Sequence, residues 1–180
     1  MPPDTVTLLD AQGRRLGTMD KLAAHQAPGH LHEAFSVLVF DDEARLLLQQ
    51  RAPSKYHFGG LWSNTCCSHP HGDVRADARA RTAAEVGLQV DLEVVGQFTY
   101  RAQDDGTGLV EHERDTVLVG YVPSGTVPTL DPDEVAATRF TTVAELEADL
   151  AARPGAYTPW LREALACARS AGHPRRRDVR

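Results

Sequence analysis

The chain has 180 residues, of which 42% are hydrophobic and 24% charged, and its formal net charge at pH 7 is −6. This length fits a single domain, 1–180, with one core, and the negative charge argues against nonspecific nucleic-acid binding, which needs Lys and Arg to neutralise phosphates. No apolar run approaches the roughly 18 residues of a membrane span, and the first residues lack the basic and apolar segments of a signal peptide. We therefore expect a cytoplasmic protein that binds neither membrane nor nucleic acid.

The first part of the chain predicts short strands joined by turns. A hairpin is expected around Gly13, and a second around the acidic turn 41–43, where a buried strand reverses direction. A further short strand is expected to end at Pro70. The strands of this part are expected at 6–9, 14–18, 34–40, 45–50 and 63–69.

The second part mixes helices and strands. Residues 73–85 are rich in Ala and Arg, which favour helix, and Gly87 is a plausible stop. Strands are expected at 90–100, 110–122 and 134–140, a helix from Thr142, and a last helix at 159–171. The order predicts an α/β (α+β) fold in which mixed β-sheets are sandwiched by helices.

The cysteine count and the basic C-terminal residues limit which metal sites, disulfides and ordered segments can be expected. Three cysteines without a CxxC spacing argue against a disulfide framework or a cysteine zinc site, so reduced thiols are expected. The run Arg175-Arg176-Arg177 indicates a disordered basic end at about 172–180, with anion binding as the alternative.

Two histidines, His25 and His32, flank Ala27-Pro28-Gly29. Because proline and glycine favour a loop, we expect both imidazoles on one loop, where they either converge on a metal or face solvent. His30 and His57 are not paired with another candidate ligand in this way, and we expect them to be structural or exposed.

The run Cys66-Cys67-Ser68-His69 falls on a predicted strand. Alternate residues of a strand share a face, so Cys67 and His69 point one way and Cys66 the other. One thiol can then be catalytic beside a ligand histidine. The alternative is that both cysteines are small buried hydrophobic residues.

Glu111 and Glu113 are also two apart on a predicted strand and face the same way. Two close carboxylates repel each other unless a cation holds both ionised. A metal site and a solvated strand edge both remain open, and His112 is expected to face away.

Arg81 and Glu85 lie one turn apart on the predicted helix. They form either an ion pair or a site in which the glutamate binds Mg²⁺ and the arginine binds a diphosphate carried by that ion. Lys21, Arg51 and Lys55 are further candidate cations.

These residues occur in the order typical of one enzyme family. The matches in chain order are Lys21 and His25, Leu31-His32 before Ala34-Phe35-Ser36, Arg51-Ala52 with Ser54-Lys55, Trp62-Ser63-Asn64 leading to Cys67 and His69-Pro70, Tyr100-Arg101-Ala102, Glu111 with Glu113, and Pro159-Trp160. From about Val6 to the last helix the chain resembles the type I isopentenyl diphosphate isomerases, which have a Nudix fold. Each match alone is weak, but the series is specific.

The resemblance implies a site and a reaction. The implied reaction converts isopentenyl diphosphate to dimethylallyl diphosphate, in isoprenoid biosynthesis, through a tertiary carbocation. The implied catalytic residues are Cys67, Glu113 and Tyr100. The resemblance implies that the ligands to Mn²⁺ or Zn²⁺ are His25, His32, His69, Glu111 and Glu113. It also implies that Mg²⁺ is bound by Glu85 and the backbone carbonyl of Cys67. The implied substrate-binding residues are Lys21, Arg51, Lys55, Arg81 and Trp160.

The chain departs from the Nudix pattern in places. Ser68 stands where the pattern has its opening glycine, and the segment between His69 and Glu85 is shorter and retains one helix glutamate. The loss of the other glutamates disfavours the alternative of a Nudix-type diphosphate hydrolase. A noncatalytic metal-binding protein is a third possibility. The expected partner is a small-molecule diphosphate, and the expected state is a monomer or weak homodimer.

Overall fold

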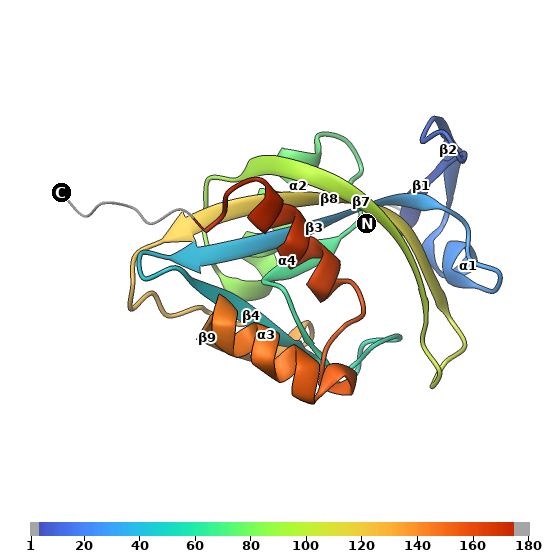
Figure 1. Cartoon of the computed structure of the whole chain (residues 1–180). Helices are drawn as coiled ribbons and strands as arrows, with labels where there is room; N and C mark the ends of the chain where they lie inside the picture. Colours follow the sequence, from blue (N-terminus) through green and yellow to red (C-terminus); the bar gives the residue numbers. More distant parts are fainter. Residues whose placement is uncertain (1–3, 175–180) are drawn as a thin grey trace.

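The computed structural model of the chain describes residues 4–174 (Figure 1). Within this range nine strands form one mixed sheet. The strands are β1 (Thr5–Leu9), β2 (Arg15–Asp20), β3 (His32–Asp41), β4 (Arg45–Arg51), β5 (Trp62–Ser63), β6 (Cys66–Ser68), β7 (Glu93–Gln103), β8 (Val110–Val122) and β9 (Val135–Thr142).

β3 is central because it pairs with β1, β4, β6 and β8. Its pairing with β8 is parallel and runs from His32 opposite Glu113 to Asp41 opposite Val122. The other pairs between the described strands are antiparallel. The long β7–β8 hairpin therefore lies along one side of β3, while β4 and β9 continue the sheet on the other.

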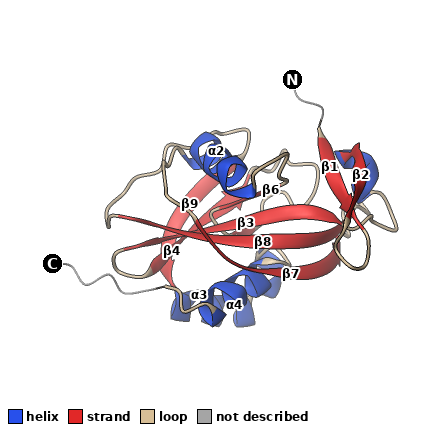
Figure 2. Cartoon of the chain, turned by 90° about the horizontal axis from the view of Figure 1, so that it is seen from above, coloured by secondary structure: helices blue, strands red, loops and turns tan. Residues whose placement is uncertain are grey.

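The helices lie on both sides of this sheet (Figure 2). α2 (Val74–Val86) covers one face, and α3 (Val143–Ala152) and α4 (Leu161–Ser170) cover the other. α1 (Lys21–His25) follows β2 at the end of the sheet, and a 3₁₀ turn spans Pro154–Ala156. None of the helices in residues 4–174 combines the length and apolar character needed to cross a bilayer.

Local sequence signals fix the ends of the helices. The Asp73 carboxylate accepts a hydrogen bond from the Ala76 amide at the start of α2, and Gly87 ends that helix at φ +69°. A Cβ at Gly87 would lie 2.8 Å from Cβ of Thr129, so a side chain does not fit there. Thr142 and Glu145 form a capping box at the start of α3.

The alternation of β3 separates two apolar layers. Phe35, Val37 and Val39 pack in the cluster that contains Ala78 and Val86 of α2. Leu38 and Phe40 pack in the cluster on the opposite face, which contains Leu146 of α3 and Leu161, Ala164 and Leu165 of α4. The sheet is therefore covered on both faces, and it holds the strand ends that carry the polar site.

The structure confirms the predicted α+β layers and the other predicted strands and helices, with small shifts at their ends, but the strand expected to end at Pro70 is two short strands, β5 and β6, separated at residues 64–65. A second expectation was also wrong. His25 and His32 do not share a loop, because His25 ends the helix α1 and His32 begins β3. In the expected tail, residues 172–174 are described, with His173 buried and its Nδ1 2.8 Å from the Tyr121 hydroxyl. The remainder, 175–180, lies outside the described residues.

Candidate active site

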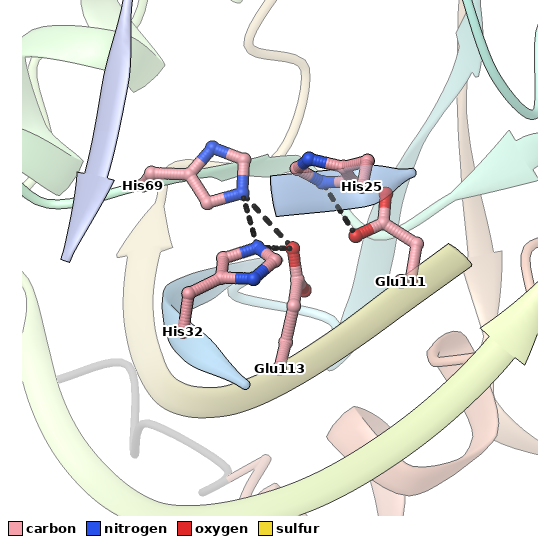
Figure 3. A group of neighbouring side chains, drawn as sticks. All are labelled: His25, His32, His69, Glu111 and Glu113. Atoms are coloured by element: carbon pink, nitrogen blue, oxygen red, sulfur yellow. Dashed lines mark hydrogen bonds and ion pairs between the residues drawn. The ribbon is translucent and has the colours of Figure 1, made fainter. Parts of the chain in front are cut away.

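Five side chains from distant parts of the chain converge at one end of the sheet (Figure 3). Each offers one ligand atom, and these atoms lie within 4.8 Å of one another. The residues are His25, His32, His69, Glu111 and Glu113. They are the five for which the resemblance implies a transition-metal site.

Strand register explains the convergence. Glu111 and Glu113 are alternate residues of β8 and share a face. His32 lies directly beside Glu113 in the parallel β3–β8 pair. His69 follows β6, whose Ser68 pairs with Phe35 of β3. Three strand ends therefore supply four ligands, and α1 adds the fifth, His25.

The imidazoles present their Nε2 atoms to the carboxylates. Nε2 of His25 is 3.1 Å from Oε2 of Glu111, while Oε1 of Glu113 is 3.0 Å from Nε2 of His69 and 3.4 Å from that of His32. Nδ1 of His25 lies 2.6 Å from the Lys21 carbonyl, and Nδ1 of His32 lies 2.7 Å from the His30 carbonyl. These bonds hold a proton on Nδ1, so Nε2 is the nitrogen that can lose its proton and bind a metal.

Burial and hydrogen bonding oppose each other at the two carboxyls. Glu111 and Glu113 are 3% and 6% exposed. Burial and the Glu113 charge raise the pKa of Glu111, but hydrogen bonds to His25 and His57 outweigh them and lower it. Burial likewise opposes ionisation of Glu113, yet hydrogen bonds to His32 and His69 hold its pKa well below its usual range. Both carboxylates are therefore ionised.

The donor set fits a divalent ion. Burial lowers the pKa of His69, which favours the neutral imidazole that a metal requires. Three imidazole nitrogens and two carboxylate oxygens suit Mn²⁺, Fe²⁺ or Zn²⁺, and a cation also offsets the repulsion between two buried carboxylates.

A cavity of ≈ 370 Å³ adjoins this cluster. Its lining brings together the predicted catalytic thiol, carboxylate and tyrosine, the predicted cations and the predicted aromatic residue. These residues are Cys67, Glu113, Tyr100, Lys21, Arg51, Lys55, Arg81 and Trp160. Residues expected to act on one substrate therefore share one cavity.

Cys67 and Tyr100 carry protons in this cavity. Burial raises the pKa of Cys67 to about 12, against the opposing effect of Arg51, whose Nη1 is 3.6 Å from the sulfur. Burial, reinforced by the Glu113 charge, also raises the pKa of Tyr100 well above its usual value. The Tyr100 hydroxyl donates to Oε2 of Glu113 at 2.6 Å.

Trp160 gives the cavity an aromatic wall. Its Nε1 donates to Oδ1 of Asn64 at 3.1 Å, which fixes the indole. The ring centroids of Phe58 and Tyr100 lie 5.5 and 5.9 Å from that of Trp160, and the Arg51 guanidinium lies 5.6 Å from the Trp160 ring centroid.

The basic side of the cavity contains an acid that the sequence did not single out. Glu134 forms an ion pair with Lys55 and lies 3.3 Å from Nη2 of Arg81. It follows Asp131-Pro132-Asp133 at the start of the strand expected over 134–140, where it resembles an ordinary surface acid. The sequence therefore gave no signal that it would pair with two predicted diphosphate ligands.

Glu85 occupies a more enclosed position than the other predicted ligands. Its Oε1 accepts from Arg81 at 2.6 Å and its Oε2 from Gln49 at 3.3 Å. It is buried, and it is not among the described residues that line the cavity. The i,i+4 ion pair is thus formed, and each Glu85 oxygen already accepts one hydrogen bond.

Of the two alternatives for His57, structural or exposed, the structure excludes exposure, because this residue is buried. It also lies at the site, which was not expected, since its Nε2 forms an ion pair with Oε1 of Glu111. Its loop position, far from any periodic pattern, concealed this contact.

The remaining histidines and cysteines lie as expected. His30 and His71 are exposed, and His112 turns its Nδ1 towards the Gly29 carbonyl at 3.1 Å, away from the five ligands. Cys66 is buried in the α2-side core, and Cys167 is partly buried on α4.

Comparison with known proteins gives consistent results. Residues 30–161 match the NUDIX domain. The chain is 51% identical over 92% of its length to "Isopentenyl-diphosphate Delta-isomerase" of Nocardia farcinica, covering 95% of that protein. It is 46% identical over 89% of its length to the protein of the same name from Halorhodospira halophila, covering 92% of it.

Solved structures show similarity of fold. DR0079 from Deinococcus radiodurans superposes with a TM-score of 0.69 at 15% identity, covering 91% of this chain and 98% of that one. The NUDIX domain of Shewanella oneidensis NrtR gives 0.58 at 13% identity, covering 78% and 86%.

Proposed function

The chain belongs to the isopentenyl-diphosphate Delta-isomerases of the NUDIX family, and we propose that it converts isopentenyl diphosphate to dimethylallyl diphosphate by proton exchange at Cys67 and Glu113. The observation that carries this proposal is a single cavity lined both by a thiol, a carboxylate, a tyrosine and an indole and by four cationic side chains. An apolar alkene with a diphosphate tail has the matching polarity.

The reaction requires one proton to be added to the terminal CH₂ and a different one to be removed from C2. The raised pKa of Cys67 keeps its thiol protonated, and the lowered pKa of Glu113 keeps its carboxylate ionised. Cys67 and Glu113 therefore hold one transferable proton between them before turnover, on Cys67. After turnover they again hold one, on Glu113. Tyr100, bonded to Oε2 of Glu113, provides a route by which the proton can return.

The proposed metal centre keeps the two carboxylates ionised and oriented. His25, His32, His69, Glu111 and Glu113 would hold Mn²⁺ or Zn²⁺. When bound, the ion supplies positive charge that keeps both carboxylates ionised and fixes their orientation. The side chains of this chain then carry out the proton exchange.

The basic residues bind the diphosphate. Lys21, Arg51, Lys55 and Arg81 line the same cavity, and charge-assisted hydrogen bonds to phosphate are the strong ones. Mg²⁺ typically takes one or two carboxylates plus substrate phosphates, so Glu85 and the carbonyl of Cys67 would hold it there. Binding energy from this remote group can be used to close the cavity over the small alkene.

The aromatic wall protects the tertiary carbocation. Trp160 offers a π face to a developing cation, an interaction of about 2 kcal/mol when desolvated. Its burial and its bond to Asn64 hold the ring in place without an induced movement.

Nuclear magnetic resonance tests the proposal directly. Purified protein is incubated with isopentenyl diphosphate, Mg²⁺ and Mn²⁺ in D₂O, and ¹H and ³¹P spectra follow the alkene and the phosphates. We expect the allylic methyl signals of dimethylallyl diphosphate with deuterium uptake and an intact diphosphate. Released phosphate or pyrophosphate would instead indicate the hydrolase alternative, and an unchanged alkene would refute both activities.

A further inference from the structure

The two oxygens of Glu111 have different partners. Oε2 faces Nε2 of His25 at 3.1 Å, within the five-residue cluster. Oε1 pairs with Nε2 of His57. The carboxylate is thus held through both of its oxygens, and the second contact comes from a residue outside the cluster.

His57 is built into this position. It is 6% exposed, and its ring lies 5.4 Å from that of His25 and 4.2 Å from that of Tyr56. Its Nδ1 is buried without a hydrogen-bond partner, so the contact to Glu111 is the polar contact that orients the ring.

The loop that carries His57 is tied down on both sides of it. The Arg51 guanidinium donates to the carbonyls of His57 and Phe58, each at 3.2 Å. The Phe58 amide donates to the Asp104 carboxylate of the β7–β8 hairpin at 2.7 Å. The backbone therefore fixes the place from which the imidazole reaches Glu111.

The chemistry of the contact determines its direction. An ionised carboxylate only accepts hydrogen bonds, so Nε2 of His57 carries the proton of this contact. Because this donor occupies Oε1, the carboxylate is oriented so that its other oxygen, Oε2, is presented to an ion. Partners of this kind orient metal ligands, and their loss typically weakens metal binding.

We propose that His57 is a positioning residue of the metal centre, which holds Oε1 of Glu111 so that Oε2 is presented to the ion. The inference rests on the proposed metal site and extends it by one residue. His57 is not itself assigned as a ligand, because its Nε2 pairs with Oε1 of Glu111 and His57 is not one of the five residues whose ligand atoms cluster.

Metal titration of matched variants tests this role. His57→Leu removes the donor but keeps bulk, whereas His57→Gln places an amide N–H at a similar reach. His30→Leu is the control, since it makes the same change at an exposed histidine close in sequence to the ligands. Free Mn²⁺ is measured by electron paramagnetic resonance as each metal-free protein is titrated, and circular dichroism checks that each is folded.

We expect His57→Leu to bind Mn²⁺ about 10–100-fold more weakly than the unmodified chain, and His57→Gln and His30→Leu to bind it nearly as well. The absorption spectrum of bound Co²⁺ should change in His57→Leu, because Glu111 is then free to reorient, and remain similar in His57→Gln. If His57→Leu does not fold, His57→Ala removes the same donor with less strain.

The outcomes separate the inference from the site on which it rests. Equal Mn²⁺ affinity and an unchanged Co²⁺ spectrum in His57→Leu would overturn the role of His57 while leaving the metal centre intact. Equal weakening in His57→Leu and His57→Gln would overturn the donated hydrogen bond as its basis. Unchanged binding in His25→Ala would instead place the ion elsewhere and overturn the metal centre itself.

Discussion

The hydroxyl of Tyr100 lies 2.6 Å from Oε2 of Glu113, while Oε1 of the same carboxylate lies 3.0 Å from Nε2 of His69. Glu113 therefore has one oxygen directed to the histidine cluster and one to a proton donor in the cavity. This division lets one side chain serve both as metal ligand and as proton carrier.

Tyr100→Phe should lower kcat by about 100-fold or more, the scale of general acid–base contributions. The ring, and with it the wall formed with Trp160, is retained, so we expect KM to change little. Mn²⁺ content should be unchanged, because the hydroxyl contacts the oxygen that does not face His69. Steady-state kinetics and metal analysis of the same preparation check this, and unchanged kcat would exclude Tyr100 from the proton route.

Replacing the adjacent cysteines should give opposite results. Cys67→Ala should abolish turnover with the fold intact, because it removes the cavity thiol. Cys66→Ala should retain turnover but lower the free energy of unfolding by about 1 kcal/mol, since Cys66 is packed in the core. Isomerase assays and urea unfolding measure the two effects. Retained activity in Cys67→Ala with loss in Cys66→Ala would reverse the assignment of strand faces.

Cys67 should be slow to alkylate in the ligand-free protein. Burial raises its pKa to about 12, so near pH 8 it holds less thiolate than an ordinary cysteine, and iodoacetamide should modify it on the order of 100-fold more slowly. Because the thiolate fraction keeps growing with pH, the rate should still rise at pH 10, where an ordinary thiol has levelled off. Peptide mass spectrometry follows the modification, and a plateau below pH 9 would contradict the raised pKa.

Affinity for Mn²⁺ should fall as the pH is lowered from about 8 to 6. Burial opposes protonation of His25, but the Glu111 hydrogen bond outweighs it and raises the pKa of His25. His25 is therefore protonated at a higher pH than an ordinary imidazole, and this proton must leave before Nε2 can bind the ion. Titrations at several pH values measure the effect, and affinity independent of pH would argue against His25 as a ligand.

Two arginines of α2 offer a matched test of diphosphate binding. Arg81 lines the cavity, whereas Arg79 pairs at 3.1 Å with the exposed Asp91. Arg81→Ala should raise KM by about 10–100-fold, the loss of a hydrogen bond to a charged group, and Arg79→Ala should leave it unchanged. Circular dichroism must show both variants folded. Equal KM values in the two variants would remove Arg81 from the diphosphate site.

The parts that local pattern determines were predictable from the sequence. Alternation placed Glu111 beside Glu113 and separated Cys67 from Cys66, and Asp73 and Gly87 bounded α2 closely. Contacts between distant loops were not predictable from the sequence, because the periodicity of one segment contains no information about its contacts with another. His57 reaches Glu111 only because Arg51 and Asp104 hold its loop, and Glu134 pairs with Lys55 across the fold.

The parallel pairing of β3 with β8 also has a consequence for how the chain acquires its activity. His25 and Glu111 are 86 residues apart in sequence, and they meet across a strand pair that contains no local contacts. Closing such long loops costs entropy before any contact compensates for it, which makes this step slow relative to hairpin formation. We therefore expect the ability to capture a metal ion to arise late in folding, so that the rate of metal uptake by refolding chains reports the assembly of the central sheet.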